Sequence, residues 1–230
     1  MKIHGFNKLT LLDYPGKMAA TIFLGHCNFR CPFCQNGGLV LNPDKEPVIP
    51  VEDVLKVLKK RQGILDGVCI TGGEPTLHPD LADFIAQIKN LGYAVKLDTN
   101  GSHPKVIKDL VEQKLIDYVA MDIKNAPSRY GETAGVLHLD FSSIQESVEF
   151  LLSGVVDYEF RTTVTRELHT ETEFRQIGEW IFGCKRYFLQ GYQESGQVIC
   201  PVFTSYTRDE LEVFRDILQK KIPDVQIRGI

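Results

Sequence analysis

The stretch GVCITGGEPTLHPDLADFIAQIKNLGYAVKLDTNG (67–101) contains the pattern that decides the fold. Both of its ends hold apolar runs typical of buried strands. Between them, apolar residues recur at helical spacing over 81–91, with Pro79 shortly before and Gly92 directly after. A strand, a helix and a second strand in this order predict a parallel, right-handed βαβ unit.

The same alternation continues on both sides of this unit. The apolar, strand-like runs lie at 19–24, 67–71, 94–98, 118–122, 158–164 and 186–190, with a weaker one at 225–228. Three of the helical patterns begin with pairs typical of capping boxes: Ser143 with Glu146, Thr170 with Glu173 and Thr207 with Glu210.

The number of units selects the architecture. Six or seven units fit the 230 residues, whereas a complete eight-unit barrel takes about 250. We therefore expect an α/β fold that forms a partial, open TIM-like barrel of about six βα units, with parallel strands and outer helices. A doubly wound open sheet is the alternative, because periodicity alone does not separate the two.

Composition narrows the class of protein. The chain is 43% hydrophobic and 24% charged, with a formal net charge of −4, which is ordinary for a globular protein. The missing basic excess argues against a nucleic-acid partner, and no apolar run reaches the ~20 residues that cross a bilayer. The first residues lack the apolar stretch of a secretory signal. We therefore expect a cytoplasmic protein with no membrane partner and a single domain over 1–230.

Polar motifs follow four of the expected strands, at 25–36, 71–75, 98–101 and 122–124. The carboxyl ends of parallel strands gather on one face, where ligands bind, so we expect these segments to form one site. Each has a simpler explanation on its own, as a tight turn or a helix cap. Their joint arrangement beside a group of cysteines favours a functional site.

Three of the six cysteines fall within eight residues. Cys27, Cys31 and Cys34 form a C-x3-C-x2-C pattern. In a reducing compartment, such cysteines are more typical of metal ligands than of disulfides. Three thiolates with one open position suit an iron–sulfur cluster that keeps one iron free. A zinc ion completed by a distant histidine is the chemical alternative, because structural zinc needs a fourth ligand.

The cysteine loop, with Phe33 as its aromatic residue, resembles the signature of radical S-adenosylmethionine (SAM) enzymes. The segment GGEP (72–75) resembles the glycine-rich motif of the same superfamily. The resemblance implies one [4Fe-4S] cluster per chain, held by the three cysteines of the loop, with SAM chelated to the open iron. It also implies that one electron breaks the sulfonium carbon–sulfur bond, giving methionine and a 5′-deoxyadenosyl radical.

Further segments resemble the glycyl-radical-enzyme activating enzymes, and among them those that act on anaerobic ribonucleoside-triphosphate reductase. The segments are LDYPG (12–16), KLDTNG (96–101), MDIK (121–124), FRTTV (160–164) and LQ (189–190). The resemblance implies a glycyl-radical enzyme as protein partner and a flavodoxin or ferredoxin-type reductant. It implies no catalytic residue beyond the cluster and the cofactor, because a hydrogen atom is transferred rather than a proton. The cofactor-binding residues that it implies are Phe33, Gly72, Gly73, Glu74, Asp98, Asn100, Asp122, Lys124 and Arg161.

Several features leave alternatives open. The gap between Cys34 and Cys69 holds no cysteine, so we expect a single cluster. Cys69, Cys184 and Cys200 are expected to be packing residues. The segment 125–141 either shapes a groove for a protein substrate or is a long loop. A radical SAM enzyme that acts on a small molecule or a peptide is the second hypothesis, and an iron–sulfur electron carrier or a zinc-binding module is the third.

Overall fold

The computed structural model describes all 230 residues and contains one eight-stranded sheet. The strands are β1 (Ile3–Thr10), β2 (Ala19–Leu24), β3 (Gly67–Gly72), β4 (Ala94–Thr99), β5 (Tyr118–Asp122), β6 (Asp157–Val164), β7 (Arg186–Gly191) and β8 (Asp224–Arg228). They lie side by side in chain order, and every pair from β2 to β8 is parallel. The sheet is therefore an open barrel, because a doubly wound sheet would reverse its strand order.

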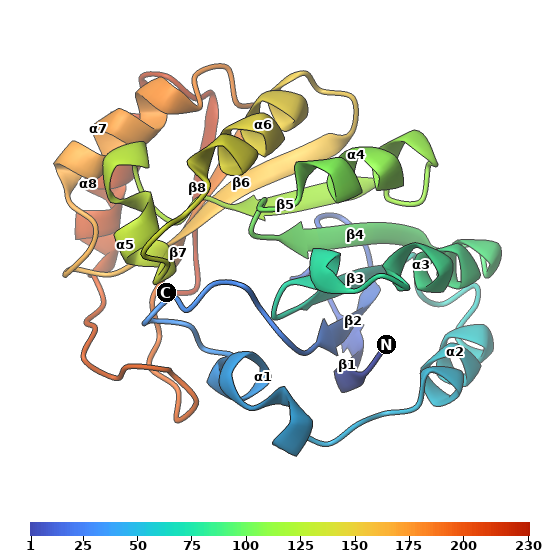
Figure 1. The fold of residues 1–230 in the computed structure, drawn as a ribbon. Coiled ribbons are helices and arrows are strands. Elements are labelled where there is room, and N and C mark those ends of the chain that lie inside the picture. The colour runs from blue at the N-terminus through green and yellow to red at the C-terminus, as the bar shows by residue number, and fades with distance from the viewer.

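Helices cover the outer side of the curved sheet (Figure 1). The α-helices are α1 (Gly37–Leu41), α2 (Val51–Lys60), α3 (Leu81–Asn90), α4 (Pro104–Glu112), α5 (Tyr130–Ala134), α6 (Phe141–Leu152), α7 (Glu171–Trp180) and α8 (Arg208–Gln219). The short 3-10 helices are η1 (Pro43–Lys45), η2 (Pro75–Leu77) and η3 (Pro127–Arg129). Each parallel strand from β2 to β7 is followed by at least one α-helix before the next strand, which gives the six expected βα units. None of these helices has the length and apolarity needed to cross a membrane.

The two faces of the strands carry different chemistry. On β4, Val95 and Leu97 belong to the main apolar core, whereas the alternate residues Lys96 and Asp98 are buried and charged. Successive side chains of a strand point to opposite faces, so the apolar positions pack on one face while the charged ones share the other. The barrel interior thereby acquires buried charges that the outer core does not contain.

The structure corrects three local expectations. Strand β1 was not expected from the sequence; it pairs antiparallel with β2 and adds an eighth strand at the sheet edge. The α6 helix begins with Asp140 as its N-cap rather than with the pair at Ser143, because the Asp140 carboxylate accepts from the Ser142 amide. The two other capping boxes, at Thr170 and Thr207, are confirmed. The segment 125–141 contains η3 and α5, and so is not one long loop.

Candidate active site

A cavity of about 230 Å³ lies at the carboxyl ends of the strands, lined by residues of the cysteine loop and of β3 to β7. It brings together segments that are more than 160 residues apart in the chain. With the exception of Glu74, every residue expected at the site lines this cavity: Cys27, Cys31, Phe33, Cys34, Gly72, Gly73, Asp98, Asn100, Asp122, Lys124 and Arg161. The expectation that four strand-end segments meet in one place is therefore confirmed.

The cysteine loop, residues 25–36, is held in place by two distant segments. On one side the amide of Arg30 donates to the carbonyl of Ala134, at 2.9 Å. On the other side the Cys200 amide donates to the Pro32 carbonyl, at 2.8 Å, and the Ile199 amide donates to the Cys34 carbonyl, at 3.2 Å. The three cysteines are thus positioned by the α5 region and by the segment between β7 and α8.

Two glycines let this loop cross directly over the end of β3. Gly72 has φ +121°, a conformation that favours glycine. A Cβ on Gly73 would lie 1.8 Å from the carbonyl oxygen of His26, which is an impossible contact. The Gly73 amide donates to the Leu24 carbonyl at 2.8 Å, and the amide of Glu74 donates to the His26 carbonyl at 2.7 Å. The glycines therefore have a packing role as well as a place in the cavity wall.

The Glu74 side chain is fully buried outside the cavity and holds the end of β4. One carboxylate oxygen accepts from the Thr99 hydroxyl at 2.8 Å and from the Thr76 amide at 3.1 Å, and the other accepts from the Asn100 amide at 2.7 Å. Burial raises the pKa of the carboxyl group, although these hydrogen bonds oppose that shift. Glu74 therefore does not line the cavity, and its side chain positions Asn100.

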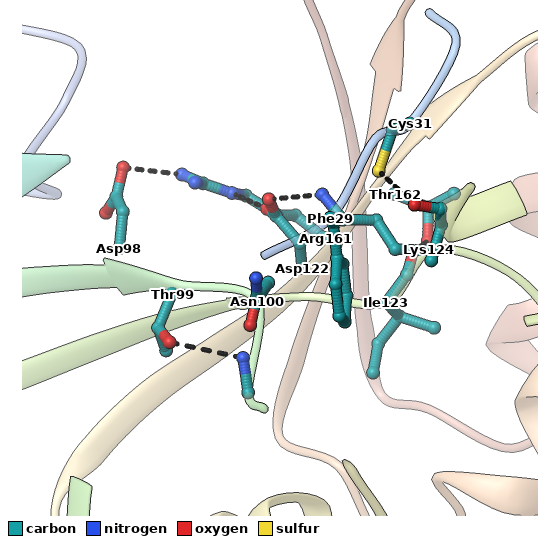
Figure 2. Close-up of polar contacts among 12 residues, drawn as sticks. Phe29, Cys31, Asp98, Thr99, Asn100, Asp122, Ile123, Lys124, Arg161 and Thr162 are labelled. Atoms are coloured by element: carbon teal, nitrogen blue, oxygen red, sulfur yellow. Dashed lines mark hydrogen bonds and ion pairs between the residues drawn. The ribbon is translucent and has the colours of Figure 1, made fainter. Parts of the chain in front are cut away.

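Charged residues of alternating sign cross three neighbouring strands (Figure 2). Lys96 pairs with Asp98 on β4, and Arg161 of β6 contacts both carboxylates, Asp98 at 3.0 Å and Asp122 at 2.5 Å. Asp122, at the end of β5, also accepts from Lys124 at 2.8 Å. The register of the sheet creates this order, because Asp122 and Arg161 are direct partners across β5 and β6.

The network fixes the charge of each member. Burial opposes ionisation of Asp98 and Asp122, but Arg161 and the lysines outweigh it and hold the pKa of both carboxyl groups below the usual range. Burial likewise lowers the pKa of Lys124, yet Asp122 more than compensates, so its pKa lies above normal. Three cations therefore face two anions, which leaves an excess of positive charge to attract an anionic group such as a carboxylate.

The cysteines of the loop differ in exposure: Cys31 is buried, whereas Cys27 and Cys34 are half-buried. Burial raises the pKa of Cys27 to about 11 and that of Cys31 to about 12. Both are protonated at neutral pH, so iron or zinc would have to displace their protons. No three Cys, His, Asp or Glu side chains are grouped closely enough to hold a single metal ion.

The other cysteines differ from one another in environment. Cys184 is part of the main apolar core, as expected for a packing residue. Cys69 is buried but polar in its contacts: its thiol donates to Asp98 at 3.5 Å and lies 3.8 Å from the Lys96 amine. Cys69 is therefore buried in its strand, as expected, but its thiol packs against charged groups and not only against apolar ones. Cys200 is half-buried beside the cysteine loop.

Some residues of the cavity were not anticipated. Thr163 of β6 and Gln190 of β7 face each other in register and both line the cavity. They stand within the segments 160–164 and 189–190 that the resemblance had singled out. Thr163 lies two residues beyond Arg161, on the same face of β6, and this spacing was the available signal. His169 was missed altogether. It is buried behind Phe33, bonds the Lys124 carbonyl at 2.8 Å and fixes this end of the cavity wall.

Comparison with known proteins identifies the family. Residues 21–153 match the model of the radical SAM superfamily. The chain belongs to this superfamily. Radical SAM enzymes use a [4Fe-4S] cluster and SAM, and both are consistent with a cavity that joins three cysteines to a charged network. The fold and the enzyme class expected from the sequence are thus confirmed.

Individual relatives cover most of the chain. A protein of Methanocaldococcus jannaschii, MJ1227, is 34% identical over 99% of this chain and 96% of its own length, and its name assigns it provisionally as a glycyl-radical enzyme activating enzyme. The 7-carboxy-7-deazaguanine synthase of Koribacter versatilis is 29% identical over 72% of this radical SAM chain and 70% of its own. The crystal structure of Streptococcus suis SuiB superposes with a TM-score of 0.71 at 16% identity, over 92% of this chain and 49% of SuiB. This chain therefore spans about half of SuiB, and that likeness concerns the fold alone.

Proposed function

We propose that this radical SAM enzyme generates a glycyl radical on a partner enzyme. The nearly full-length match to MJ1227 carries the proposal, because that relative is named as an activating enzyme and is 34% identical. Four of the five segments that resemble activating enzymes contribute residues to the cavity, which supports the same function; the segment 12–16 does not. The proposed partner is anaerobic ribonucleoside-triphosphate reductase, and the proposed electron source is a flavodoxin or a ferredoxin-type protein. The whole chain, 1–230, is proposed to act as one radical SAM domain.

The proposed cluster ligands are Cys27, Cys31 and Cys34, one cluster per chain. Their fit rests on two features of the structure: the three cysteines line one cavity, and the loop that carries them is held on both sides. The proposed SAM contacts are Phe33, the backbone of Gly72, Gly73 and Glu74, and the side chains of Asp98, Asn100, Asp122, Lys124 and Arg161.

The chain's residues would bind and orient SAM while excluding water. When bound, the reduced cluster supplies the electron that breaks the sulfonium carbon–sulfur bond. Lys124 and Arg161 provide donors suited to a carboxylate, and Asp98 and Asp122 keep these cations charged and aligned. Asp98 is 8% exposed, so water would compete little for these contacts. No side chain has to act as a general base, because the partner's glycine loses a hydrogen atom.

A small-molecule substrate is the second candidate function. The observation that favours it is the 29% identity to 7-carboxy-7-deazaguanine synthase over 173 residues. Residues around the cofactor are common to both reaction types, and the fold by itself does not choose between them.

One experiment separates the two candidates. The protein is loaded anaerobically with iron and sulfide, reduced, and mixed with SAM and the anaerobic ribonucleotide reductase of the same organism. A glycyl signal in electron paramagnetic resonance (EPR), together with 5′-deoxyadenosine, is the expected result. Formation of 5′-deoxyadenosine without a glycyl signal would reject the proposed partner and favour the small-molecule reaction. If a fully loaded enzyme forms none at all, the proposed use of SAM fails.

Substitution tests the ligand assignment. Cys31→Ala should lose the visible absorption of the cluster and most of the bound iron. Cys200→Ser is the matched control, because Cys200 lies beside the same loop but does not line the cavity. Equal iron contents in the two variants would contradict the proposed ligand set.

A further inference from the structure

The three cysteines of the loop differ in their hydrogen-bond partners. The Cys27 sulfur accepts from the Phe29 amide at 3.3 Å and lies 3.9 Å from the side-chain amide nitrogen of Asn100. The Cys31 thiol instead donates to the Ala134 carbonyl at 3.8 Å, a contact that a thiolate cannot make. Cys34 receives no donor from the chain. Only Cys27 therefore has a side-chain N–H directed at its sulfur.

Asn100 has one possible orientation for its amide. Its Oδ1 accepts from the backbone N–H of Ser102 at 2.9 Å. A backbone N–H is always a donor, so oxygen must occupy this position and Nδ2 must face the opposite way. Nδ2 then lies 2.9 Å from the Asn28 side-chain oxygen and in contact with the Cys27 sulfur. The donor role of Asn100 toward Cys27 follows from this geometry.

A ring of hydrogen bonds immobilises this amide. Asn28 donates from its Nδ2 to the Ser102 hydroxyl at 2.8 Å, which closes the ring with Asn100. The backbone amide of Asn100 is tied to the buried Glu74 carboxylate at 2.7 Å. Asn100 is 5% exposed, so its N–H group points at sulfur with little competition from water. In such a shielded place a hydrogen bond has a larger electrostatic effect than in solvent.

From these contacts we infer that Asn100 raises the reduction potential of the cluster through Cys27, as a positioning residue that acts on a ligand. The reduced cluster carries one more negative charge than the oxidised one, and that charge is shared with the thiolates. An N–H directed at a thiolate therefore stabilises the reduced form, and hydrogen bonds to sulfur are among the determinants of iron–sulfur potentials. The inference rests on the proposed cluster ligands and is independent of which molecule receives the radical.

The effect is measured as a midpoint potential on the loaded enzyme without SAM, by redox titration monitored by EPR. Asn100→Ala removes the donor without adding charge. The Asn100→Ser variant keeps a side-chain oxygen as a possible acceptor for the Ser102 amide, lacks the amide N–H and adds no charge, so it supports the turn if the alanine variant binds iron poorly. We expect each variant to shift the ratio of reduced to oxidised cluster at least tenfold toward the oxidised form, which is 59 mV for one electron.

Ser102→Ala is the matched control. It removes the hydroxyl that holds Asn28 but keeps the backbone N–H that orients Asn100. Its ratio of reduced to oxidised cluster should change less than twofold. The inference is overturned if the Asn100 variants retain a full iron content and the same ratio as the parent, or if Ser102→Ala shifts the ratio equally. Absence of iron in the parent protein would instead reject the proposed cluster ligands, so the two failures are distinguishable.

Discussion

Replacement of Arg161 by methionine tests whether the charged network is a structural requirement of the barrel. Methionine has a similar length but no charge, so Asp98 and Asp122 each lose one cationic partner and keep one lysine. Removal of one member of a buried ion pair costs about 3–5 kcal/mol. Each carboxylate retains a lysine, and the Asp122 side chain is 28% exposed. We therefore expect the free energy of unfolding to fall by about 3 kcal/mol, at the lower end of this range.

The loss should depend on pH in a defined direction. Asp98 and Asp122 have lowered pKa values in the folded protein. Their contribution to stability is therefore fully present above the unfolded pKa of about 3.9 and disappears as the pH falls through the folded values. The difference between Arg161→Met and the parent should be largest near pH 7. It should shrink below about pH 4, because the uncompensated carboxylates of the variant become protonated.

Urea unfolding of the metal-free protein, followed by circular dichroism, measures this difference. With m-values of about 2–3 kcal/mol per M, a 3 kcal/mol loss moves the midpoint by about 1 M. Arg175→Met is the matched control, because Arg175 forms an exposed pair with Glu171 on α7 and should change stability by less than about 0.5 kcal/mol. The reasoning is refuted if Arg161→Met costs less than about 1 kcal/mol, or no more than the control.

Three further predictions concern other parts of the fold. Burial lowers the pKa of His169 to about 4, so its neutral form stabilises the protein above its unfolded pKa of about 6.5. About 3 kcal/mol of that stability should be lost as the pH falls toward 4. The His169→Gln variant should not show this loss. If the free energy of unfolding falls with pH equally in parent and variant, the prediction is wrong. Gly73→Ala should lower the free energy of unfolding in urea by about 1–3 kcal/mol and reduce iron binding, because the new Cβ would meet the His26 carbonyl. Gly196→Ala is the control: its Cβ would lie in open space, so the free energy of unfolding should not change. Asp140→Ala should lower the free energy of unfolding by about 1 kcal/mol, as loss of an N-cap does, which thermal unfolding would measure. A larger decrease for Ser143→Ala would instead support the helix start expected from the sequence.

Most strands could be predicted from the sequence because their apolar runs are nearly continuous, as buried parallel strands require. Strand β1 could not, because its sequence IHGFNKLT mixes apolar and polar residues and most of its side chains are half-buried or exposed. Such a pattern is normal for an edge strand and resembles a loop when read alone. The start of α6 was misplaced for a different reason: Asp140, Ser142 and Ser143 all have capping side chains, and local sequence does not decide which one closes the helix.

The site residues could be found by type and position, but their roles could not. Glu74 belongs to the segment 72–75, whose two glycines line the cavity. Its carboxylate nevertheless lies outside the cavity and binds the end of β4. Cys69 reads as a small apolar residue within a buried strand, yet strand alternation places it beside Lys96 and Asp98. In both cases the outcome depends on which neighbour the sheet register brings alongside, and register is a long-range property that one strand's sequence does not contain.

The charged network shows how local spacing and long-range register combine. The pairs at 96 and 98 and at 122 and 124 are two residues apart, so each pair projects toward one face of the chain and its members can interact directly. Neither pair alone implies a link to the other, since each is already neutral. Arg161 makes the link because the β5–β6 register sets it beside Asp122 while its guanidinium also reaches Asp98. The excess positive charge of the network therefore comes from β6, the strand whose Arg161 would contact a bound anion.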